Sequence, residues 1–199
     1  MGANPATNVR GPREKRMERR AVAREDVERL IASQPDLRDQ VAIMLLAWLG
    51  FRKSELGQLR IGDFNLAAGT VTVHGKGGHE DVLPIGFERL RVALELHLVE
   101  REPAVDEFLI YPKGHRTRPM DHSSLHRWFK RCLATAGLPA DVKIHELRHT
   151  AAQALYELSG DLVLAQQLLR HEDVRTTRGY VRDSMERLRE AQAALEASW

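Results

Sequence analysis

The spacing of apolar residues follows a helical period along most of this chain and changes to a strand period in one short region. Thr70 to His74 alternates between polar and apolar residues, as a half-buried strand does, and Asp81 to Ile85 follows as its partner after a glycine-rich turn. Phe108 to Tyr111, just before Pro112, is a candidate third strand. The sequence therefore predicts a mainly α domain with a small antiparallel β-sheet, which is an α+β fold.

Helical spacing accounts for the other ordered segments. The helix over about 37–49 is mostly apolar and ends at Gly50, a residue that tolerates the backbone conformation of a helix terminus. The remaining helices are expected over about 25–31, 54–59, 87–100, 123–136, 146–158, 162–169 and 184–197, with a short segment around Tyr180. At 199 residues, the chain is long enough to bury a core as one domain, or as one domain and an arm.

The distribution of charge says more than its sum. A net charge of +2 permits nucleic-acid binding without requiring it. Residues 1–24, however, hold seven arginines and lysines against two glutamates, which predicts a flexible arm that is either solvated or bound to phosphates. The single cysteine, Cys132, cannot form an internal disulfide and is expected to be a buried thiol. Without a signal peptide or a membrane-length apolar run, we expect a cytoplasmic protein.

Several short stretches carry side chains suited to breaking a phosphodiester bond. The transition state of that reaction concentrates negative charge on phosphate oxygens, so fixed cations and hydrogen-bond donors stabilise it. Arg52 follows a helix break, and Glu55, three positions on, is placed to orient the Arg52 guanidinium. A planar guanidinium can bind two oxygens at once. The alternative for this stretch is a solvated first turn of a helix.

The helix after His145 has one apolar stripe at helical spacing, formed by Leu147, Ala151, Ala154, Leu155 and Leu158. His145 and Arg148 are three positions apart, so we expect them side by side on the opposite face, where an imidazole and a guanidinium can act together. The alternative is an exposed polar face.

His145 to His149 also satisfies the H-E-x-x-H pattern of zinc proteases. An arginine is an awkward neighbour for zinc, and Glu157, the nearest candidate for a third ligand, is poorly placed on the helix. The zinc alternative predicts stoichiometric metal whose removal abolishes activity.

Three further residues complete the set. Lys76 lies in the glycine-rich turn between the two strands, where glycines allow close approach of a backbone to DNA. His171 follows a helix whose apolar spacing docks it on the core, and Tyr180 lies nine positions later. A tyrosine of ordinary pKa, about 10, becomes a nucleophile only where a base and cations favour its phenolate. The alternatives are an exposed hairpin lysine and a surface tyrosine.

In this order, the stretches around Arg52, Lys76, His145 to Arg148, His171 and Tyr180 resemble the tyrosine recombinase family, the phage-integrase type of site-specific recombinase. The resemblance implies a tyrosine recombinase catalytic-domain fold. It also implies that the two arginines hold the scissile phosphate, that His145 assists proton transfer, and that His171 donates a hydrogen bond to a non-bridging oxygen.

The resemblance implies a complete reaction. Tyr180 attacks the phosphate and forms a 3′-phosphotyrosyl link, while Lys76 gives a proton to the departing 5′ oxygen. A 5′ hydroxyl from the partner strand then reverses the step, and two rounds pass through a Holliday junction without ATP, metal or other cofactor. The implied partners are double-stranded DNA at recombination sites, a homotetramer on that DNA and an accessory DNA-bending protein, with no membrane. The alternatives are a type IB topoisomerase and a non-catalytic DNA-binding regulator.

The resemblance covers about residues 23–182, and it has departures. Arg170 stands where a glycine is common before the histidine, Gly179 precedes the tyrosine, and Phe51 replaces a frequent leucine. The chain has no room for the N-terminal core-binding domain of such recombinases. We therefore expect an isolated catalytic domain.

The expected organisation has three parts. Residues 1–24 form a basic linker or arm, residues 25–183 form the catalytic domain, and residues 184–199 form a helical tail that docks on its own core or on a neighbouring protomer.

Overall fold

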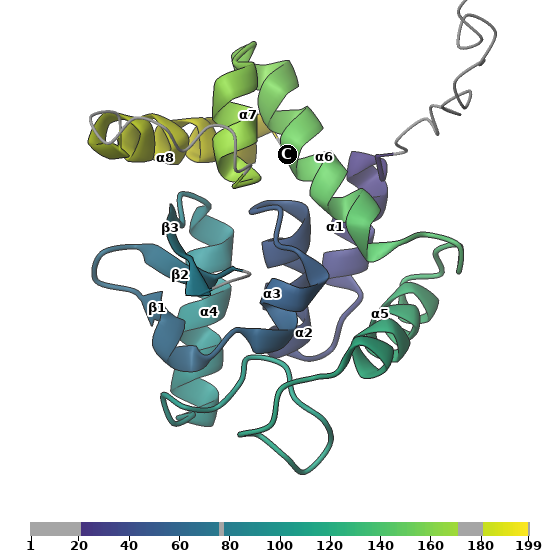
Figure 1. Ribbon diagram of the computed structural model, residues 1–199. Coiled ribbons are helices and arrows are strands. Elements are labelled where there is room, and N and C mark those ends of the chain that lie inside the picture. The colour runs from purple at the N-terminus through teal and green to yellow at the C-terminus, as the bar shows by residue number, and fades with distance from the viewer. Residues whose placement is uncertain (1–20, 76–77, 171–180, 199) are drawn as a thin grey trace, which may run out of the picture.

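Helices make up most of the fold, and one small sheet interrupts them, as the sequence predicts (Figure 1). The computed structural model describes residues 21–75, 78–170 and 181–198, the side chains of residues 181–184 excepted. The elements are α1 (Arg24–Ala32), α2 (Leu37–Ala47), α3 (Lys53–Gln58), the 3-10 helix η2 (Ile61–Asp63), β1 (Phe64–Asn65), β2 (Thr70–His74), β3 (Glu80–Pro84), α4 (Glu88–Arg101), α5 (His122–Thr135), α6 (Ile144–Ser159), α7 (Leu162–Leu168) and α8 (Val181–Ser198). Within the described part of the chain, no helix combines the length and the apolarity needed to cross a bilayer.

The core is built around α2, whose residues from Val41 onward are buried on every face. An apolar surface all round requires partners all round, and α2 packs against α1, α3, α4 and α6. Asp36 caps the helix by accepting a hydrogen bond from the Arg38 N–H at 2.9 Å. Cys132 on α5 belongs to the same core, and burial raises the pKa of its thiol to about 12. The expectation of a buried thiol is confirmed.

The three strands form an antiparallel sheet in the order β1-β2-β3, with Val71 opposite Leu83. The prediction of a strand at Phe108 to Tyr111 is wrong, because the third strand is the short β1. Phe108 forms only an isolated bridge with Arg60. The Leu109 N–H donates to the Leu59 carbonyl at 2.8 Å, so the segment bonds to the loop after α3 instead of to the sheet.

The C-terminal helix α8 docks on the core of its own chain, where it contacts α6, α7 and β3. Its apolar side is represented by Leu188 and Leu195, each 3% exposed. The Glu196 carboxylate accepts the Glu88 N–H at 2.6 Å and the Arg89 N–H at 2.8 Å. A carboxylate at this place satisfies free donors at the start of α4 and its positive dipole end. The tail thus caps another helix as well as covering the core.

Gly86 lies in the tightest part of this contact. Its N–H donates to the side-chain oxygen of the fully buried Gln192 at 2.6 Å. A Cβ at position 86 would lie 2.6 Å from the Arg189 carbonyl oxygen. The absence of a side chain at Gly86 is therefore what lets α8 approach the strand end this closely.

The segment before α1 also contacts the domain. The Val22 N–H donates to the Thr150 hydroxyl on α6 at 2.9 Å, and that hydroxyl lies 3.3 Å from the Val22 carbonyl. The chain is therefore held against α6 two residues before α1 begins.

Candidate active site

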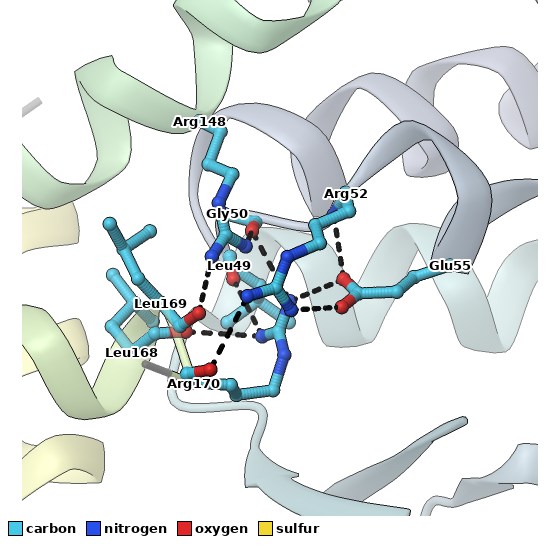
Figure 2. Close-up of polar contacts among 8 residues, drawn as sticks. All are labelled: Leu49, Gly50, Arg52, Glu55, Arg148, Leu168, Leu169 and Arg170. Carbon is cyan, nitrogen blue, oxygen red and sulfur yellow. Dashed lines mark hydrogen bonds and ion pairs between the residues drawn. The ribbon is translucent and has the colours of Figure 1, made fainter. Parts of the chain in front are cut away.

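Three guanidinium groups and one carboxylate gather where α3, α6 and the end of α7 come together, and two of the three bond to the carboxylate, as Figure 2 shows. Arg52 comes from the N-cap of α3, Arg148 from α6, and Arg170 from the residue after the last turn of α7. The carboxylate is Glu55 on α3. We call these four residues the arginine cluster.

Arg52 and Glu55 form the pair that their spacing predicts. The Arg52 guanidinium donates to Glu55 Oε1 at 2.6 Å, and the Arg52 N–H donates to Glu55 Oε2 at 2.6 Å. The same carboxylate therefore caps the helix and orients the guanidinium. The Arg52 side chain is 42% exposed and that of Glu55 is 4% exposed. A buried carboxylate thus holds a guanidinium that is accessible to solvent.

Arg148 is buried, with 3% of its surface exposed. Its guanidinium donates to the carbonyl oxygens of Gly50 and Leu169, and among the described residues no carboxylate forms an ion pair with it. Burial, together with the charges of Arg170 and Arg52, lowers the pKa of Arg148 to about 9. The group still carries its proton at neutral pH, so it is a buried positive charge without a counter-ion of its own.

Gly50 makes the approach of Arg148 possible. Its φ is +61°, and a Cβ there would lie 2.8 Å from the Leu169 side chain. Glycine alone adopts this conformation without strain and leaves room for α6 and α7 against the loop. Gly50, three residues after the end of α2, therefore presents its carbonyl oxygen to the arginine cluster.

Arg170, which stands where the resemblance predicts a glycine, is also buried, with a side chain 2% exposed. It forms a 2.5 Å ion pair with Glu55 Oε2. Burial alone would raise the pKa of Glu55, but the charge of Arg170 and the hydrogen bonds from Arg52 lower it. Burial also lowers the pKa of Arg170, an effect that Glu55 opposes. The signal available in the sequence was a charged residue directly after a helix that contains no charged side chain.

Three consecutive carbonyl groups at the end of α7 each accept a hydrogen bond from a different arginine. The Leu168 oxygen accepts from Arg170 at 3.1 Å, the Leu169 oxygen from Arg148, and the Arg170 oxygen from Arg52 at 3.3 Å. The last carbonyls of a helix have no partner within the helix and carry its negative dipole end, so they suit cations. The chain leaves this turn directly into His171.

His145 does not share the setting of Arg148, contrary to the expectation of a common polar face. His145 is exposed at the start of α6, and its ring lies edge-on to that of His149 at 4.5 Å between centroids. Arg148 is instead covered by the Gly50 loop and the end of α7. In the part of the chain that the structure describes, no group of three or more His, Cys, Asp or Glu side chains is arranged to hold a metal ion.

A second charged group lies at the loop end of the β2–β3 hairpin, next to the connection that carries Lys76. His74 lies 2.8 Å from Asp63 through Nε2 and 3.2 Å from Glu80 through Nδ1. The hydrogen bond to Asp63, aided by the charges of both carboxylates, raises the pKa of His74. Lys76 itself, like His171 and Tyr180, lies outside the described residues. The structure thus brings together Arg52, Glu55 and Arg148 of the predicted site.

Comparison with known proteins points to one family. The model of the phage integrase family matches residues 20–187. The tyrosine recombinase XerC of Actinobacillus pleuropneumoniae serotype 7 (strain AP76) is 32% identical over 187 residues, which cover 90% of this chain and 60% of that protein. The chain therefore spans less than two thirds of the length of this curated relative.

Two solved structures share the fold. The integrase from mycobacterium phage Brujita has a TM-score of 0.70 and 26% identity, covering 88% of this chain and 57% of its own. The XerH site-specific recombinase, solved as a post-cleavage complex with a palindromic difH substrate, has a TM-score of 0.63 and 27% identity, covering 89% of this chain and 53% of its own. The mainly helical architecture with a small sheet is thus that of recombinase catalytic domains.

Proposed function

The chain belongs to the phage integrase family, and from this premise we propose that it is a tyrosine recombinase catalytic domain that cuts and rejoins DNA strands. The observation that carries the proposal is the excess of positive charge in the arginine cluster. Glu55 is shared by Arg52 and Arg170, and the partners of the buried Arg148 among the described residues are carbonyl groups. An uncompensated buried charge destabilises a fold, so a site of this kind is suited to an anion that arrives from outside.

A DNA phosphate is the anion that this site would take. Arg52 faces solvent while Glu55 fixes its orientation, so it is placed to receive a phosphate oxygen. Arg148 lies beneath it and would add charge from a site that excludes water, where electrostatic stabilisation is stronger than at a surface. For Arg148 to donate directly, the phosphate must compete with the Gly50 and Leu169 carbonyls for its N–H groups.

The covalent step is assigned to Tyr180. Its phenolate oxygen attacks phosphorus as the bond to the 5′ oxygen breaks, which leaves a 3′-phosphotyrosyl link and a free 5′ hydroxyl. His145 takes part in the transfer of the tyrosine proton, Lys76 gives the departing 5′ oxygen its proton, and His171 donates to a non-bridging oxygen. Attack by another 5′ hydroxyl reverses these events. Since one phosphodiester replaces another, the exchange needs no ATP.

The proposed substrate is double-stranded DNA at a recombination site, and the proposed assembly is a homotetramer on that DNA, with an accessory DNA-bending protein as a further partner. XerH, whose catalytic fold this chain shares, has been solved on its difH substrate. The basic segment 1–24 would serve as an arm or linker to DNA, residues 25–183 as the catalytic domain, and residues 184–199 as its tail.

A nicked suicide substrate tests the proposal, because loss of the short strand after cleavage traps the covalent intermediate. The wild-type protein should form a protein–DNA adduct, and Tyr180→Phe should form none while it keeps most of its DNA affinity. Tyr156→Phe, at an exposed tyrosine on α6, is the matched control and should behave as wild type. An adduct that persists in Tyr180→Phe identifies a different nucleophile. A protein that forms the adduct and relaxes supercoiled DNA, but does not exchange strands between paired sites, is a topoisomerase instead.

A further inference from the structure

We propose that Arg170 is a positioning residue, which holds Glu55 and thereby fixes Arg52 in the orientation that receives a phosphate. The inference rests on the proposed function, because it assigns a task to a residue that the reaction itself does not touch. Arg170 contacts Glu55 and main-chain carbonyls, and its side chain is 2% exposed, so it has no surface to offer to DNA.

The backbone at Arg170 is in a conformation that a side chain usually avoids. Its φ is +52°, in the left-handed region that favours glycine, and Glu102 is the other non-glycine residue with a positive φ among the described residues. A residue with a Cβ stays in this region only where its surroundings compensate for the strain. At Arg170 the compensation is visible in the contacts of the guanidinium.

Those contacts tie together three separate segments of the chain. The guanidinium reaches the Leu168 carbonyl at 3.1 Å, the Gly50 carbonyl at 3.2 Å and the Glu55 carboxylate at 2.5 Å. It also lies over the Phe51 ring, 5.2 Å from the centroid. One side chain thus links the end of α7, the loop after α2, and α3.

The division of the two Glu55 oxygens shows how this link acts on Arg52. Oε1 accepts from the Arg52 guanidinium, whereas Oε2 is occupied by the Arg52 N–H and by Arg170. Without Arg170, Glu55 could turn both oxygens toward the Arg52 guanidinium, the two-pronged geometry that carboxylates and arginines favour. That grip would withdraw N–H donors from a phosphate. With Arg170 in place, Arg52 is oriented by one oxygen and keeps donors for the substrate.

Arg170 also completes the turn from which the predicted site residue His171 follows. Its own carbonyl accepts from Arg52 at 3.3 Å while its guanidinium holds the Leu168 carbonyl. The orientation of Arg52 and the end of α7 are therefore linked through one residue. A substitution at Arg170 is expected to disturb the placement of donors without removing any group that touches the phosphate.

The test compares Arg170→Gly, Arg170→Lys, Glu55→Gln and the double variant Arg170→Gly/Glu55→Gln. Glycine adopts the left-handed backbone without strain, so Arg170→Gly removes the guanidinium and leaves the turn intact. On a saturating nicked suicide substrate, it should cut about 10 to 100 times more slowly than wild type, while the Kd for DNA changes less than about threefold. Arg170→Lys, which keeps the charge, should recover part of the rate. The double variant should be no slower than the slower single variant.

Arg29→Ala is the matched control, since it removes an exposed guanidinium paired with Asp26 on α1, and it should cut at the wild-type rate. A wild-type rate in Arg170→Gly overturns the inference, and so do parallel losses of cutting and DNA affinity, which would indicate a merely structural role. Additive losses in the double variant also overturn it.

Failure of the proposed function has a different signature, because the wild-type protein would then form no adduct. In that case Tm measurements on the same four variants still judge the link. Arg170→Gly and Glu55→Gln should each lower Tm by about 5 °C, and the double variant should lower it no further. Independent and additive Tm shifts would show that Arg170 does not hold Glu55.

Discussion

The arginine cluster and the loop end of the β2–β3 hairpin differ in the ratio of cationic to anionic side chains. In the described part of the arginine cluster, three guanidinium groups face one carboxylate, Glu55, which pairs with two of them, and most of the group is buried. At the loop end of the hairpin, the imidazole of His74 lies between two carboxylates, Asp63 and Glu80, and the His74 side chain is 42% exposed. Among the described residues, the first site therefore has more cationic than anionic side chains, and the second has more anionic than cationic ones.

The difference separates a site built for a ligand from a contact that serves the fold. An exposed ion pair contributes little to stability, because water screens it and both side chains lose freedom. Buried charges are costly unless they are paired, so a buried guanidinium such as Arg148, which has no carboxylate partner among the described residues, is expected to serve a purpose other than stability. We therefore propose that the arginine cluster binds an anion, whereas the contacts of His74 with Asp63 and Glu80 serve only the fold.

The largest expected effect is on the buried, carboxylate-free arginine. Arg148→Ala should slow DNA cleavage by about 100 to 1000 times, as loss of a donor to a developing negative charge does. Single-turnover cutting of a suicide substrate measures the rate, and urea unfolding checks the fold. Arg148→Lys, the control, keeps a charge but cannot donate to both the Gly50 and Leu169 carbonyls, and should be nearly as slow. Near-normal cutting by either variant would remove Arg148 from the proposed site.

The next effect is on stability and bears on Glu55. Glu55→Ala leaves the buried Arg170 without its carboxylate, which should lower the free energy of unfolding by about 3–5 kcal/mol. Chemical denaturation at neutral pH measures the change. Glu80→Ala, the control at the loop end of the hairpin, should cost less than about 1 kcal/mol because the Glu80 side chain is 64% exposed. Equal losses in the two variants would erase the distinction between the sites.

The smallest expected effect is the pH dependence of the stability that His74 contributes through Asp63 and Glu80. Because the pKa of His74 is raised in the folded protein above its ordinary value of 6.5, its contribution is complete below that value and disappears as pH rises through the folded pKa. The stability of wild type relative to His74→Gln should therefore fall above pH 6.5, by less than about 1 kcal/mol given the exposure of the side chain. A stability difference that is constant with pH would show that Asp63 and Glu80 do not stabilise the protonated form of the His74 imidazole.

Local features of the sequence were predictable, and features that join distant segments were not. The pairing of Arg52 with Glu55 follows from a spacing of three residues at a helix start. The burial of Leu147, Ala151 and Leu155 on α6 follows from the helical period, whereas Leu158 of the predicted stripe is 43% exposed. The burial of Arg148 depends on the loop at Gly50 and on the end of α7, which no local pattern brings together. The role of Arg170 needs a carboxylate 115 positions away in the chain.

The failure to predict the third strand has the same origin. Phe108 to Tyr111 has the apolar character of a strand, and Leu109 and Ile110 are buried. Whether such a segment joins a sheet depends on which backbone groups are left to bond with it, and here those belong to the loop at Leu59. Burial was readable from composition, whereas the bonding partner was not.

Because α8 packs so closely against Gly86, one added methyl group at this position is expected to displace the C-terminal helix. Since the position has no positive φ, Gly86→Ala is compatible with the backbone, yet the added methyl carbon would collide with the main chain of α8 and with Gln192. Such a variant would loosen the last helix while every residue of the arginine cluster stays chemically unchanged. It offers a way to ask what the terminus contributes without shortening the chain.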